Sequence, residues 1–215
     1  MGICWKVVED FFRECSLDPP PLLLLKTHYE MVENAPLNLI SQRSKGEAGI
    51  VRHVLNSLLG LLWIPKELRS ISQKGIDIGS GGGFPLFPLA LSLPQWEWVG
   101  VESIGKKAKY LVHMASVLQT HIQILNIRAE ALLSDFEEQF DWVTARAVAP
   151  LPTLLSLTLP FAKVGGYVLL WKGKSVEEEL VQSQNIVWRR ASYGETTLLC
   201  IQKTSQTKNP LRGFR

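Results

Sequence analysis

Cysteine is scarce in this sequence, and the few cysteines form no recognisable pattern. Cys4, Cys15 and Cys200 are the only three thiols among 215 residues, and no pair has the C-x-x-C spacing of a zinc or redox site. An odd number of scattered cysteines also argues against a disulfide framework and fits a reducing compartment. We therefore expect a cytoplasmic protein that holds no metal.

Long apolar runs and signal-peptide features are missing as well. LLLL at 22–25 and LLGLLWI at 58–64 fall far short of the roughly 20 residues that cross a membrane. The start MGICWKVVEDFF has no cationic stretch leading into a signal-peptide core. Lys6 stands where a myristoylation motif needs Ser or Thr. The sequence therefore predicts neither a membrane span nor a lipid anchor.

Strong charge of either sign is absent too. The formal net charge is only +3, so any polyanionic partner must be inferred from where the basic residues lie rather than from their sum. A chain of 215 residues is long enough to bury a sizeable core as one large domain, or as one domain with an extension.

The pattern of apolar residues changes near residue 72. Before it, apolar residues recur at helical spacing, as in Val7, Val8, Phe11 and Phe12, which predicts a helical segment. After it, short β-rich runs alternate with helical stretches, which predicts a parallel sheet with helical crossovers. The five runs are GIDIG (75–79), WEWVGVE (96–102), IQILNI (122–127), FDWVTAR (140–146) and GGYVLLWK (165–172).

Two further runs close the predicted sheet. NIVWRRAS (185–192) and ETTLLCIQK (195–203) are separated only by Tyr193 and Gly194, which predicts an antiparallel hairpin. The expected fold is therefore α/β: a Rossmann-like doubly wound sheet, mostly parallel with a C-terminal antiparallel hairpin, preceded by a helical extension. The predicted units are the helical extension at 1–71, the sheet domain at 72–203 and a basic tail at 204–215.

A glycine-rich loop, GIDIGSGGGFP at 75–85, follows the first predicted strand. In doubly wound sheets ligands bind outside the carboxyl ends of the strands, where glycines let the backbone approach the ligand closely. A dinucleotide site needs G-x-G-x-x-G, but Phe84 stands where counting from Gly79 requires the third glycine. The loop therefore departs from the dinucleotide pattern.

The loop has the order D-x-G-x-G-x-G, made by Asp77, Gly79, Gly81 and Gly83. An acid at this place repels a pyrophosphate but attracts the ammonium of an amino-acid moiety, and S-adenosylmethionine carries such an ammonium and no phosphate. Glu102 ends the next strand 23 positions after Gly79, where an acid takes ribose hydroxyls. The residues alone favour an S-adenosylmethionine-dependent methyltransferase over an ordinary glycine-rich turn.

Seven motifs stand in order between about residue 38 and residue 174. They are NLIS (38–41), RHVLNSL (52–58), the glycine loop, ESIGKKAKYL (102–111), RAEAL (128–132), ARAVAPL (145–151) and LLWKGK (169–174). Together they resemble the bacterial family of small-subunit ribosomal RNA guanine-N7 methyltransferases, known as RsmG or GidB. Such an ordered set is far more specific than the glycine loop alone.

The resemblance implies a class I methyltransferase fold with S-adenosyl-L-methionine as cofactor, and methylation of N7 of one guanosine in 16S ribosomal RNA. The implied partner is this RNA or a small-subunit precursor, and we expect a monomer. Carried over position by position, the resemblance implies cofactor contacts at Gly79, Phe84, Ala129, Glu130 and Arg146. Gly79 would admit the methionine part, Phe84 would cover an apolar face, and Ala129 and Glu130 would read the adenine edge.

The implied chemistry asks little of the protein. N7 of neutral guanine carries an exposed lone pair, so no proton has to leave before it attacks the sulfonium methyl. We therefore expect an in-line displacement without a general base, in which the protein supplies orientation. Because the product guanine is cationic, Arg146 and Lys172 are assigned to positioning contacts with cofactor, phosphate or O6.

RNA contacts are expected from basic residues near the strand ends. One group crowds the start of a predicted helix, and another lies in the acid-free tail TSQTKNPLRGFR. These side chains would neutralise phosphates and make affinity salt-dependent. Together with Lys172, the expected RNA-binding residues are Lys106, Lys107, Lys109, Lys208, Arg212 and Arg215.

Two positions depart from the family pattern. Asn56 precedes Ser57 where the family usually has an acid, which removes a charge that would orient His53 or groups facing the RNA. Leu86 follows Pro85 in place of the usual glycine, a change that a helix tolerates. The alternatives are a methyltransferase of a small molecule or protein, an RNA-binding scaffold without turnover and, more distantly, a dehydrogenase.

Overall fold

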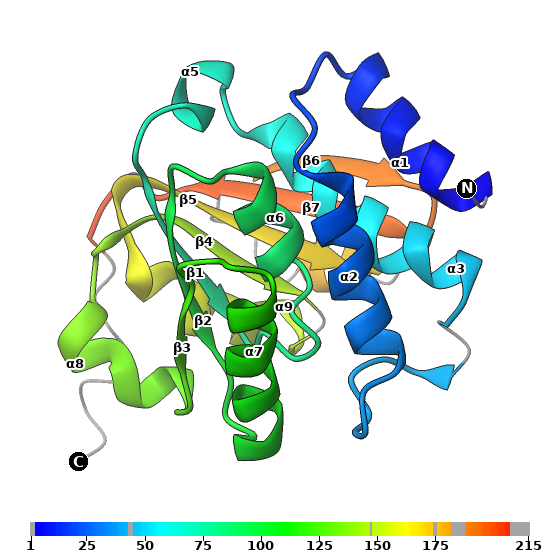
Figure 1. Cartoon of the computed structure of the whole chain (residues 1–215). Helices are drawn as coiled ribbons and strands as arrows, with labels where there is room; N and C mark the ends of the chain where they lie inside the picture. Colours follow the sequence, from blue (N-terminus) through cyan, green and yellow to red (C-terminus); the bar gives the residue numbers. More distant parts are fainter. Residues whose placement is uncertain (1–2, 43–44, 147, 174–175, 182–187, 207–215) are drawn as a thin grey trace.

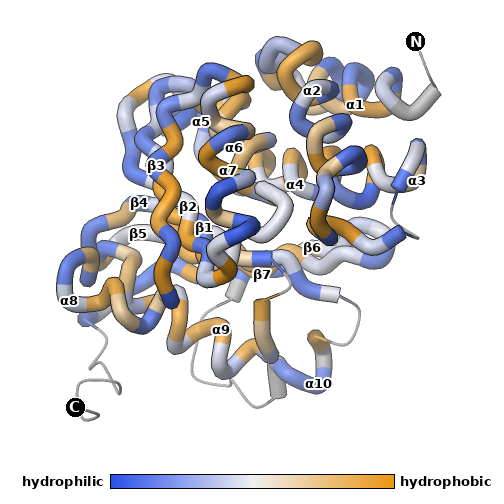
Figure 2. The backbone as a smooth tube through the Cα atoms, turned by 60° about the horizontal axis from the view of Figure 1, so that its bottom comes forward, coloured by the Kyte–Doolittle hydropathy of each residue, from blue (hydrophilic) through white to orange (hydrophobic). Residues whose placement is uncertain are grey.

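The computed structural model describes residues 3–42, 45–146, 148–173, 176–181 and 188–206. These residues contain one sheet of seven strands in the order β3-β2-β1-β4-β5-β7-β6, with helices on both of its faces (Figures 1 and 2). Strand β7 is antiparallel to β5 and β6, and the other neighbours are parallel. The strands are β1 (Lys74–Ile78), β2 (Glu97–Val101), β3 (Gln123–Leu125), β4 (Phe140–Arg146), β5 (Ala162–Lys172), β6 (Trp188–Tyr193) and β7 (Thr196–Gln202).

This strand order confirms the predicted doubly wound sheet. The chain enters the sheet at β1, runs outwards through β2 to β3, and returns to β4 on the other side of β1. The loops after β1 and β4 therefore meet where the direction of winding reverses, which is where ligands bind in open α/β sheets. The register places Asp77 of β1 between Gly100 of β2 and Thr144 of β4.

The closing hairpin is confirmed, but its turn lies one residue later than predicted. Strand β6 ends at Tyr193 and pairs there with Thr196, so the turn consists of Gly194 and Glu195 instead of Tyr193 and Gly194. Gly194 has φ +61°, a left-handed conformation that glycine adopts without steric cost. The sequence prediction placed Tyr193 in the turn, whereas in the structure Tyr193 is the last paired residue of β6.

The helical elements are short and several are irregular. Residues 47–63 form a continuous helical segment that changes from α-helix to π-helix, back to α-helix and then to 3₁₀-helix. The helical elements are α1 (Ile3–Glu14), α2 (Leu22–Glu33), α3 (Glu47–Gly49), the π-helix η2 (Ile50–Leu55), α4 (Asn56–Leu58), the 3₁₀-helix η3 (Leu59–Trp63), α5 (Lys66–Arg69), α6 (Leu86–Ser92), α7 (Gly105–Val117), the 3₁₀-helix η4 (Ala129–Leu132), α8 (Leu133–Phe136), α9 (Leu151–Thr158), the 3₁₀-helix η5 (Leu159–Phe161) and α10 (Val176–Val181).

Each face of the sheet has its own hydrophobic cluster. Side chains alternate between the two faces along each strand, so Ile76 and Ile78 of β1 pack against α8 and α9 on one face. Trp98, Trp142 and Trp171 point to the other face, which is covered by α6, α7 and the helices before residue 70. Burial on both faces explains why the strands read as nearly continuous apolar runs.

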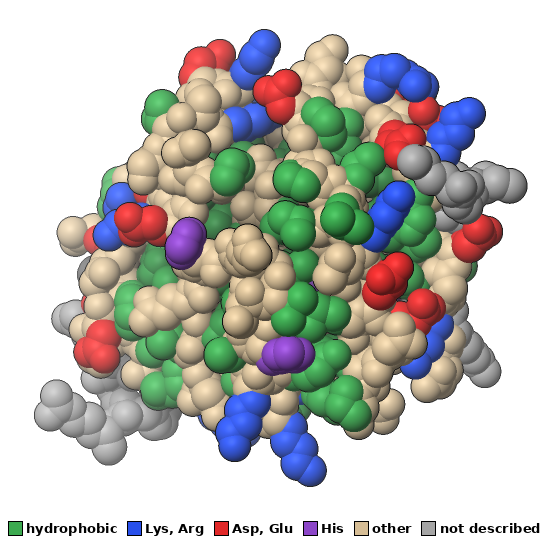
Figure 3. Space-filling view, viewed as in Figure 1, with side chains coloured by type: hydrophobic (Ala, Val, Ile, Leu, Met, Phe, Trp, Pro, Cys, Tyr) green, Lys and Arg blue, Asp and Glu red, His purple; other side chains and the backbone are tan. Residues whose placement is uncertain are grey.

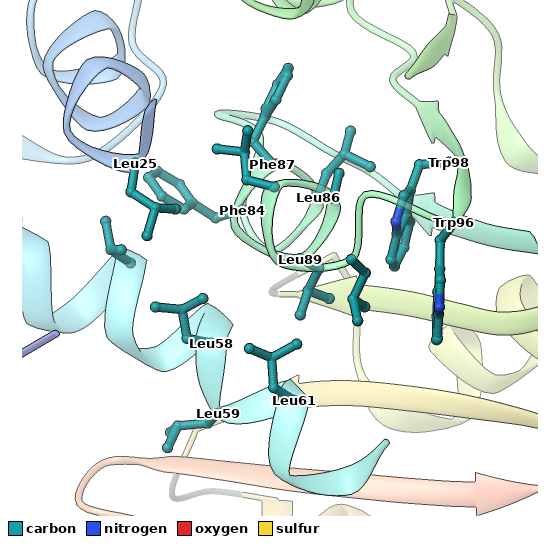
Figure 4. Packing of buried hydrophobic residues seen from close by; sticks show 14 of the residues in the cluster. Leu25, Leu58, Leu59, Leu61, Phe84, Leu86, Phe87, Leu89, Trp96 and Trp98 are labelled. Atoms are coloured by element: carbon teal, nitrogen blue, oxygen red, sulfur yellow. The ribbon is translucent and has the colours of Figure 1, made fainter. Parts of the chain in front are cut away.

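The helices before residue 70 share the core of the sheet. Leu25 on α2 and Leu58 on α4 are fully buried and belong to the same cluster as Leu86 and Leu89 on α6. Figure 4 shows Leu25 and Leu58 lying on the side of Phe84 and Leu89 that faces the helices before the sheet. Helices α2 and α4 therefore pack directly on the face of the sheet that carries Asp77.

Hydropathy varies over short distances along the chain (Figure 2). Apolar and polar residues are mixed within outer helices such as α1 and α7, as expected of helices with one buried side. Among the described residues, no helix combines the length and the apolar character needed to cross a membrane.

Candidate cofactor loop and substrate groove

The glycine loop after β1 depends on three residues with left-handed backbone. Gly79, Gly81 and Gly83 have φ of +75°, +54° and +82°, a region that disfavours side chains bearing a Cβ. A Cβ on Gly79 would lie 2.7 Å from Val148, whereas a Cβ on Gly81 would meet only a carbonyl oxygen at 3.7 Å. The space beside Gly81 is therefore open, as a site for a ligand requires.

The carboxylate of Glu102 ties this loop to the end of β2. Its Oε2 accepts from Gly81 N–H at 2.9 Å, and its Oε1 accepts from Ile104 N–H at 2.8 Å. The side chain is only 6% exposed. Each carboxylate oxygen accepts more than one hydrogen bond, so Glu102 retains acceptor capacity for ribose hydroxyls, and its assignment as the ribose acid stays a prediction.

Asp77 lies beneath the loop as a buried acid. Its Oδ1 accepts from Thr144 Oγ at 2.7 Å, while its buried Oδ2 has no hydrogen-bond partner among the described residues. Burial raises the pKa of Asp77 to about 6, and the hydrogen bonds from Thr144 and Ser80 oppose this shift. A cationic group of a ligand would satisfy the unpartnered oxygen and lower this pKa again.

The ring of Phe84 packs between two histidines of the helical extension. Its centroid lies 4.6 Å from His28 and 5.2 Å from His53, with the His53 ring stacked at 28°. Phe84 is only 7% exposed. Its side chain therefore anchors the glycine loop to α2 and η2, and the predicted contact of Phe84 with the cofactor stays a prediction.

Both histidines are neutral near pH 7. Burial lowers the pKa of His28 to about 4, and burial together with the nearby Arg146 and Arg52 guanidinium groups lowers the pKa of His53 to about 4. His28 Nε2 lies 3.1 Å from Gly82 O and donates to it, because a carbonyl oxygen only accepts. These contacts join the extension to the loop without adding charge.

Arg146, at the end of β4, holds the π-helix η2. Its guanidinium donates to the carbonyl oxygens of Arg52 at 2.9 Å and of His53 at 3.3 Å, to Ser57 Oγ at 3.4 Å and to His53 Nδ1 at 3.1 Å. π-Helical turns are rare and often occur at functional sites. Burial lowers the pKa of Arg146 to about 10, so it is still charged at neutral pH.

Asn56 stands where the family usually has an acid, which would orient His53 or groups facing the RNA. In this chain Arg146 contacts His53 Nδ1. Asn56 instead donates through Nδ2 to Thr196 Oγ at 2.8 Å, and its backbone oxygen accepts from Trp171 Nε1 at 2.6 Å. Residue 56 therefore links the extension to β5 and β7.

Lys172, at the end of β5, is committed to partners on α10 and before α9. Its ammonium lies 2.9 Å from Glu179 Oε2 and donates to Ala149 O at 3.1 Å. The same Glu179 carboxylate accepts from Leu151 N–H. The ammonium of Lys172 is therefore ion-paired and its side chain is only 10% exposed. Its expected positioning role stays a prediction.

A groove of about 590 Å³ lies between residues 48–56 and the β6–β7 turn. Trp171 is one of its lining residues and pairs in register with Arg146 on the neighbouring strand. Arg146 ends β4, and β4 is the neighbour of β1, which the glycine loop follows. The groove therefore lies one strand away from the loop on the same face of the sheet, and Arg146 is close enough to Asp77 to affect its pKa. The lining residues are Ala48, Val51, Arg52, Asn56, Arg146, Trp171, Lys172, Gly173, Tyr193, Gly194, Glu195 and Thr196.

The other predicted site residues lie after β2 and β3 or outside the described part of the chain. Ala129 is buried and Glu130 is exposed at the start of η4, after β3. Lys106 and Lys109 are exposed and Lys107 is half-buried in the first turns of α7. Figure 3 shows one face of the molecule, on which basic side chains occur in small groups separated by neutral surface. Lys208, Arg212 and Arg215 lie outside the described residues.

Several residues at this edge were not found from the sequence. Thr144, Tyr193, Glu195 and His28 carry no motif of their own, and they reach the site only through the pairing of strands and the packing of α2. Arg52 lies inside the RHVLNSL motif, which was the one available signal, but the motif did not indicate that its side chain lines the groove.

Comparison with known sequences places this site in context. A family model described as rRNA small subunit methyltransferase G matches residues 24–206. A protein of that name from Roseiflexus castenholzii is 40% identical over 73% of this chain and 66% of its own length. Another from Pseudothermotoga lettingae is 34% identical over 83% of this chain and 76% of its own length. The matched part of a third, from Roseiflexus sp. strain RS-1, spans 61% of that relative.

Solved structures share the fold at low sequence identity. A proposed S-adenosyl-L-methionine-dependent methyltransferase of Methanococcus maripaludis has a TM-score of 0.58 at 14% identity and covers 81% of this chain and 98% of its own. Precorrin-6y C5,15-methyltransferase from Geobacter metallireducens has a TM-score of 0.54 at 13% identity, covering 77% and 91%. The sheet is therefore that of the class I methyltransferases, as predicted.

Proposed function

The chain belongs to the rRNA small subunit methyltransferase G family, and we propose that it transfers a methyl group from S-adenosylmethionine to N7 of a guanosine in 16S ribosomal RNA. The observation that carries the proposal is the position of a basic groove one strand away from the glycine loop. Arg146 lies between the two, so a methyl donor in the loop would face a base in the groove.

The residues of the loop fit a nucleoside amino acid without phosphate. The unpartnered Asp77 Oδ2 is suited to an ammonium, and the open side of Gly81 leaves room for the methionine chain. Glu102, held by Gly81 N–H and Ile104 N–H, is suited to ribose hydroxyls. A buried acid in this position disfavours a pyrophosphate, which supports S-adenosylmethionine over a dinucleotide.

The proposed chemistry needs orientation rather than proton transfer. Bound S-adenosylmethionine supplies an electrophilic methyl group, and guanine N7 already carries the lone pair that attacks it. The chain's own contribution is to hold the base and the cofactor in line, which supplies several kcal/mol in well-oriented reactions. Arg146, fixed by four contacts with the extension, gives the edge where the two sites meet a rigid side.

We further propose that residues 1–71 form part of the substrate site and that 72–203 form the methyltransferase domain. The extension supplies Ala48, Val51, Arg52 and Asn56 to the groove, and the sheet domain supplies the opposite wall. Neither part lines the groove alone. This shared lining supports a substrate larger than the cofactor pocket, such as RNA.

Methyl transfer to fractionated cell components tests the proposal. The purified protein would be incubated with labelled S-adenosylmethionine and with separate fractions of ribosomal RNA, small subunits, protein and small molecules from cells lacking it. We expect label in 16S RNA, recovered as N7-methylguanosine. Label confined to protein or small molecules would support the alternative methyltransferases. Cofactor binding without any transfer would support the scaffold.

A further inference from the structure

The groove beside Arg146 contains one acid among basic residues. Of its described lining residues, Arg52, Arg146 and Lys172 are cationic and Glu195 alone is acidic. RNA is a polyanion, so a carboxylate in a groove that faces RNA repels the phosphates. The favourable contact that RNA offers to such a carboxylate is with hydrogen-bond donors on a base, and base contacts are what specify sequence.

Glu195 is held over the groove by the shape of the hairpin and by an ion pair. It is the second residue of the β6–β7 turn, directly after Gly194, whose φ is +61°. Arg52, on the opposite wall, donates through Nη2 to Glu195 Oε2 at 3.4 Å. The pair therefore joins η2 to the turn across the groove, and the carboxylate lies at the exposed rim, where 72% of the Glu195 side chain is accessible to solvent and to a ligand.

A carboxylate at this place selects one base. The Watson–Crick edge of guanine presents two adjacent donors, N1–H and the 2-amino group, and a carboxylate accepts from both at once. Adenine has an acceptor at N1, cytosine has an acceptor beside its amino group, and the single N3–H of uracil lies between two carbonyl oxygens. A carboxylate that reads this edge leaves N7, on the opposite side of the guanine, open to the methyl donor.

We propose that the groove takes the target guanine, flipped out of the RNA, and that Glu195 accepts hydrogen bonds from its N1–H and 2-amino groups. This inference rests on the proposed function and names the substrate contact within it. Half-buried Tyr193 lines the same groove and supplies the aromatic face on which flipped bases stack. The groove volume of about 590 Å³ lies within the range of small-molecule sites.

The same contact favours the reaction itself. As the N7 lone pair forms its bond to the methyl carbon, the carbon–sulfur bond breaks and its electron pair returns to sulfur, which leaves a positive charge on the guanine. This charge makes N1–H a stronger donor, so its hydrogen bond to Glu195 strengthens as the transition state is approached. The proton stays on N1, and Glu195 acts as a substrate-binding residue rather than as a base.

Removing the 2-amino group of the target guanine tests this contact directly. The methylated position is first mapped by mass spectrometry of RNA treated with the wild-type protein. Two RNAs are then prepared, with guanosine or inosine at that position, since inosine lacks only the 2-amino group. Both are assayed with the wild type, Glu195→Ala and Glu195→Gln, and with Glu97→Ala as a control, because Glu97 is an exposed acid at the start of β2.

We expect the wild type and Glu97→Ala to lose about tenfold or more in kcat/KM with inosine, because a site built for a donor is left unpaired without it. Glu195→Ala should be slower with guanosine and should treat both RNAs alike to within about twofold. Glu195→Gln should fall between. Unchanged calorimetric binding of S-adenosylmethionine to each variant shows that the loop is intact.

The outcomes separate this inference from the function on which it rests. If Glu195→Ala keeps the wild-type preference for guanosine, or if the wild type has no preference, the assignment of Glu195 is overturned while the methyltransferase activity stands. If the wild type transfers no methyl group to any RNA, the proposed function itself is overturned, and the guanine groove with it.

Discussion

Arg146 Nη2 lies 3.1 Å from His53 Nδ1. Because a guanidinium only donates, Nδ1 accepts and the ring proton of His53 lies on Nε2. The same ring stacks on Phe84, so the end of β4, the π-helix and the glycine loop are joined through one neutral imidazole. This junction places the helical extension, the cofactor loop and the groove in fixed positions relative to one another.

Replacement of Arg146 should loosen this junction. Arg146→Ala leaves the carbonyl oxygens of Arg52 and His53 without their donor, and we expect the free energy of unfolding to fall by about 1–3 kcal/mol. Urea denaturation measures this loss. Arg13→Ala removes an exposed arginine paired with Asp10 and should change stability by less than about 1 kcal/mol. Equal effects of the two substitutions would show that Arg146 does not support the π-helix.

The left-handed glycines allow a matched test of the cofactor site. Gly81 and Gly165 both have positive φ, and a Cβ on either meets no protein atom closer than 3.7 Å. Gly81→Ala and Gly165→Ala should therefore share a backbone cost of about 1–2 kcal/mol. Only Gly81→Ala intrudes on the open side of the loop, so we expect it to weaken S-adenosylmethionine binding at least tenfold. Equal calorimetric affinities for the two variants would remove the loop from the cofactor site.

Cofactor affinity should depend on pH through Asp77. The ionised carboxylate attracts the cofactor ammonium, and the pKa of Asp77 is about 6. Binding should therefore weaken as the pH falls below about 6, by at most about tenfold per pH unit. Asp77→Asn should bind more weakly at pH 8 and show a flat profile between pH 5 and pH 8, by calorimetry. A wild-type profile as flat as that of the variant would contradict the assignment.

Asp77 should also make the stability of the cofactor-free protein depend on pH. Burial raises the pKa of Asp77 in the folded state to about 6, above that of an aspartate in an unfolded chain, so its stabilising contribution is present below about pH 4 and is lost as the pH rises through about 6. Asp77→Asn should therefore raise the free energy of unfolding at pH 8, by up to about 3 kcal/mol, and change it little at pH 4. A loss of stability at pH 8 would mean that the carboxylate is needed for folding.

The sheet and the position of the glycine loop could be predicted because their signals are local. Each strand is a short apolar run, and the left-handed backbone of the loop requires its glycines. The place of Glu102 beside the loop could be predicted because it directly follows β2, while its role toward ribose stays a prediction. The sequence order of these elements was enough to predict the doubly wound fold.

The groove could not be predicted because its walls are far apart in the sequence. Asn56 reaches Thr196 across 140 positions and Arg146 reaches His53 across 93. Neither pair is marked by spacing or periodicity. The packing of Phe84 between two histidines could not be predicted either. An aromatic residue after a glycine loop looks the same in the sequence whether it contacts a cofactor or packs against other side chains.

The lysines of α7 should contribute to RNA affinity through charge alone. Lys106 and Lys109 are exposed in the first turns of the helix, and replacing both with alanine should make the slope of log affinity against log salt shallower by about 1–2. Lys66 and Lys74 are exposed away from the carboxyl ends of the strands, and replacing them should leave the slope unchanged. Filter binding with 16S RNA measures both. Identical slopes for the two double variants would remove Lys106 and Lys109 from the RNA surface.

The most direct test of the account is to measure N7-methylguanosine in 16S ribosomal RNA, by mass spectrometry, from cells that lack this protein. We expect that one N7-methylguanosine disappears in these cells, returns when the wild-type gene is restored, and does not return with a Gly81→Ala gene expressed at the same level. An unchanged set of N7-methylguanosines in the cells without the protein would contradict the account.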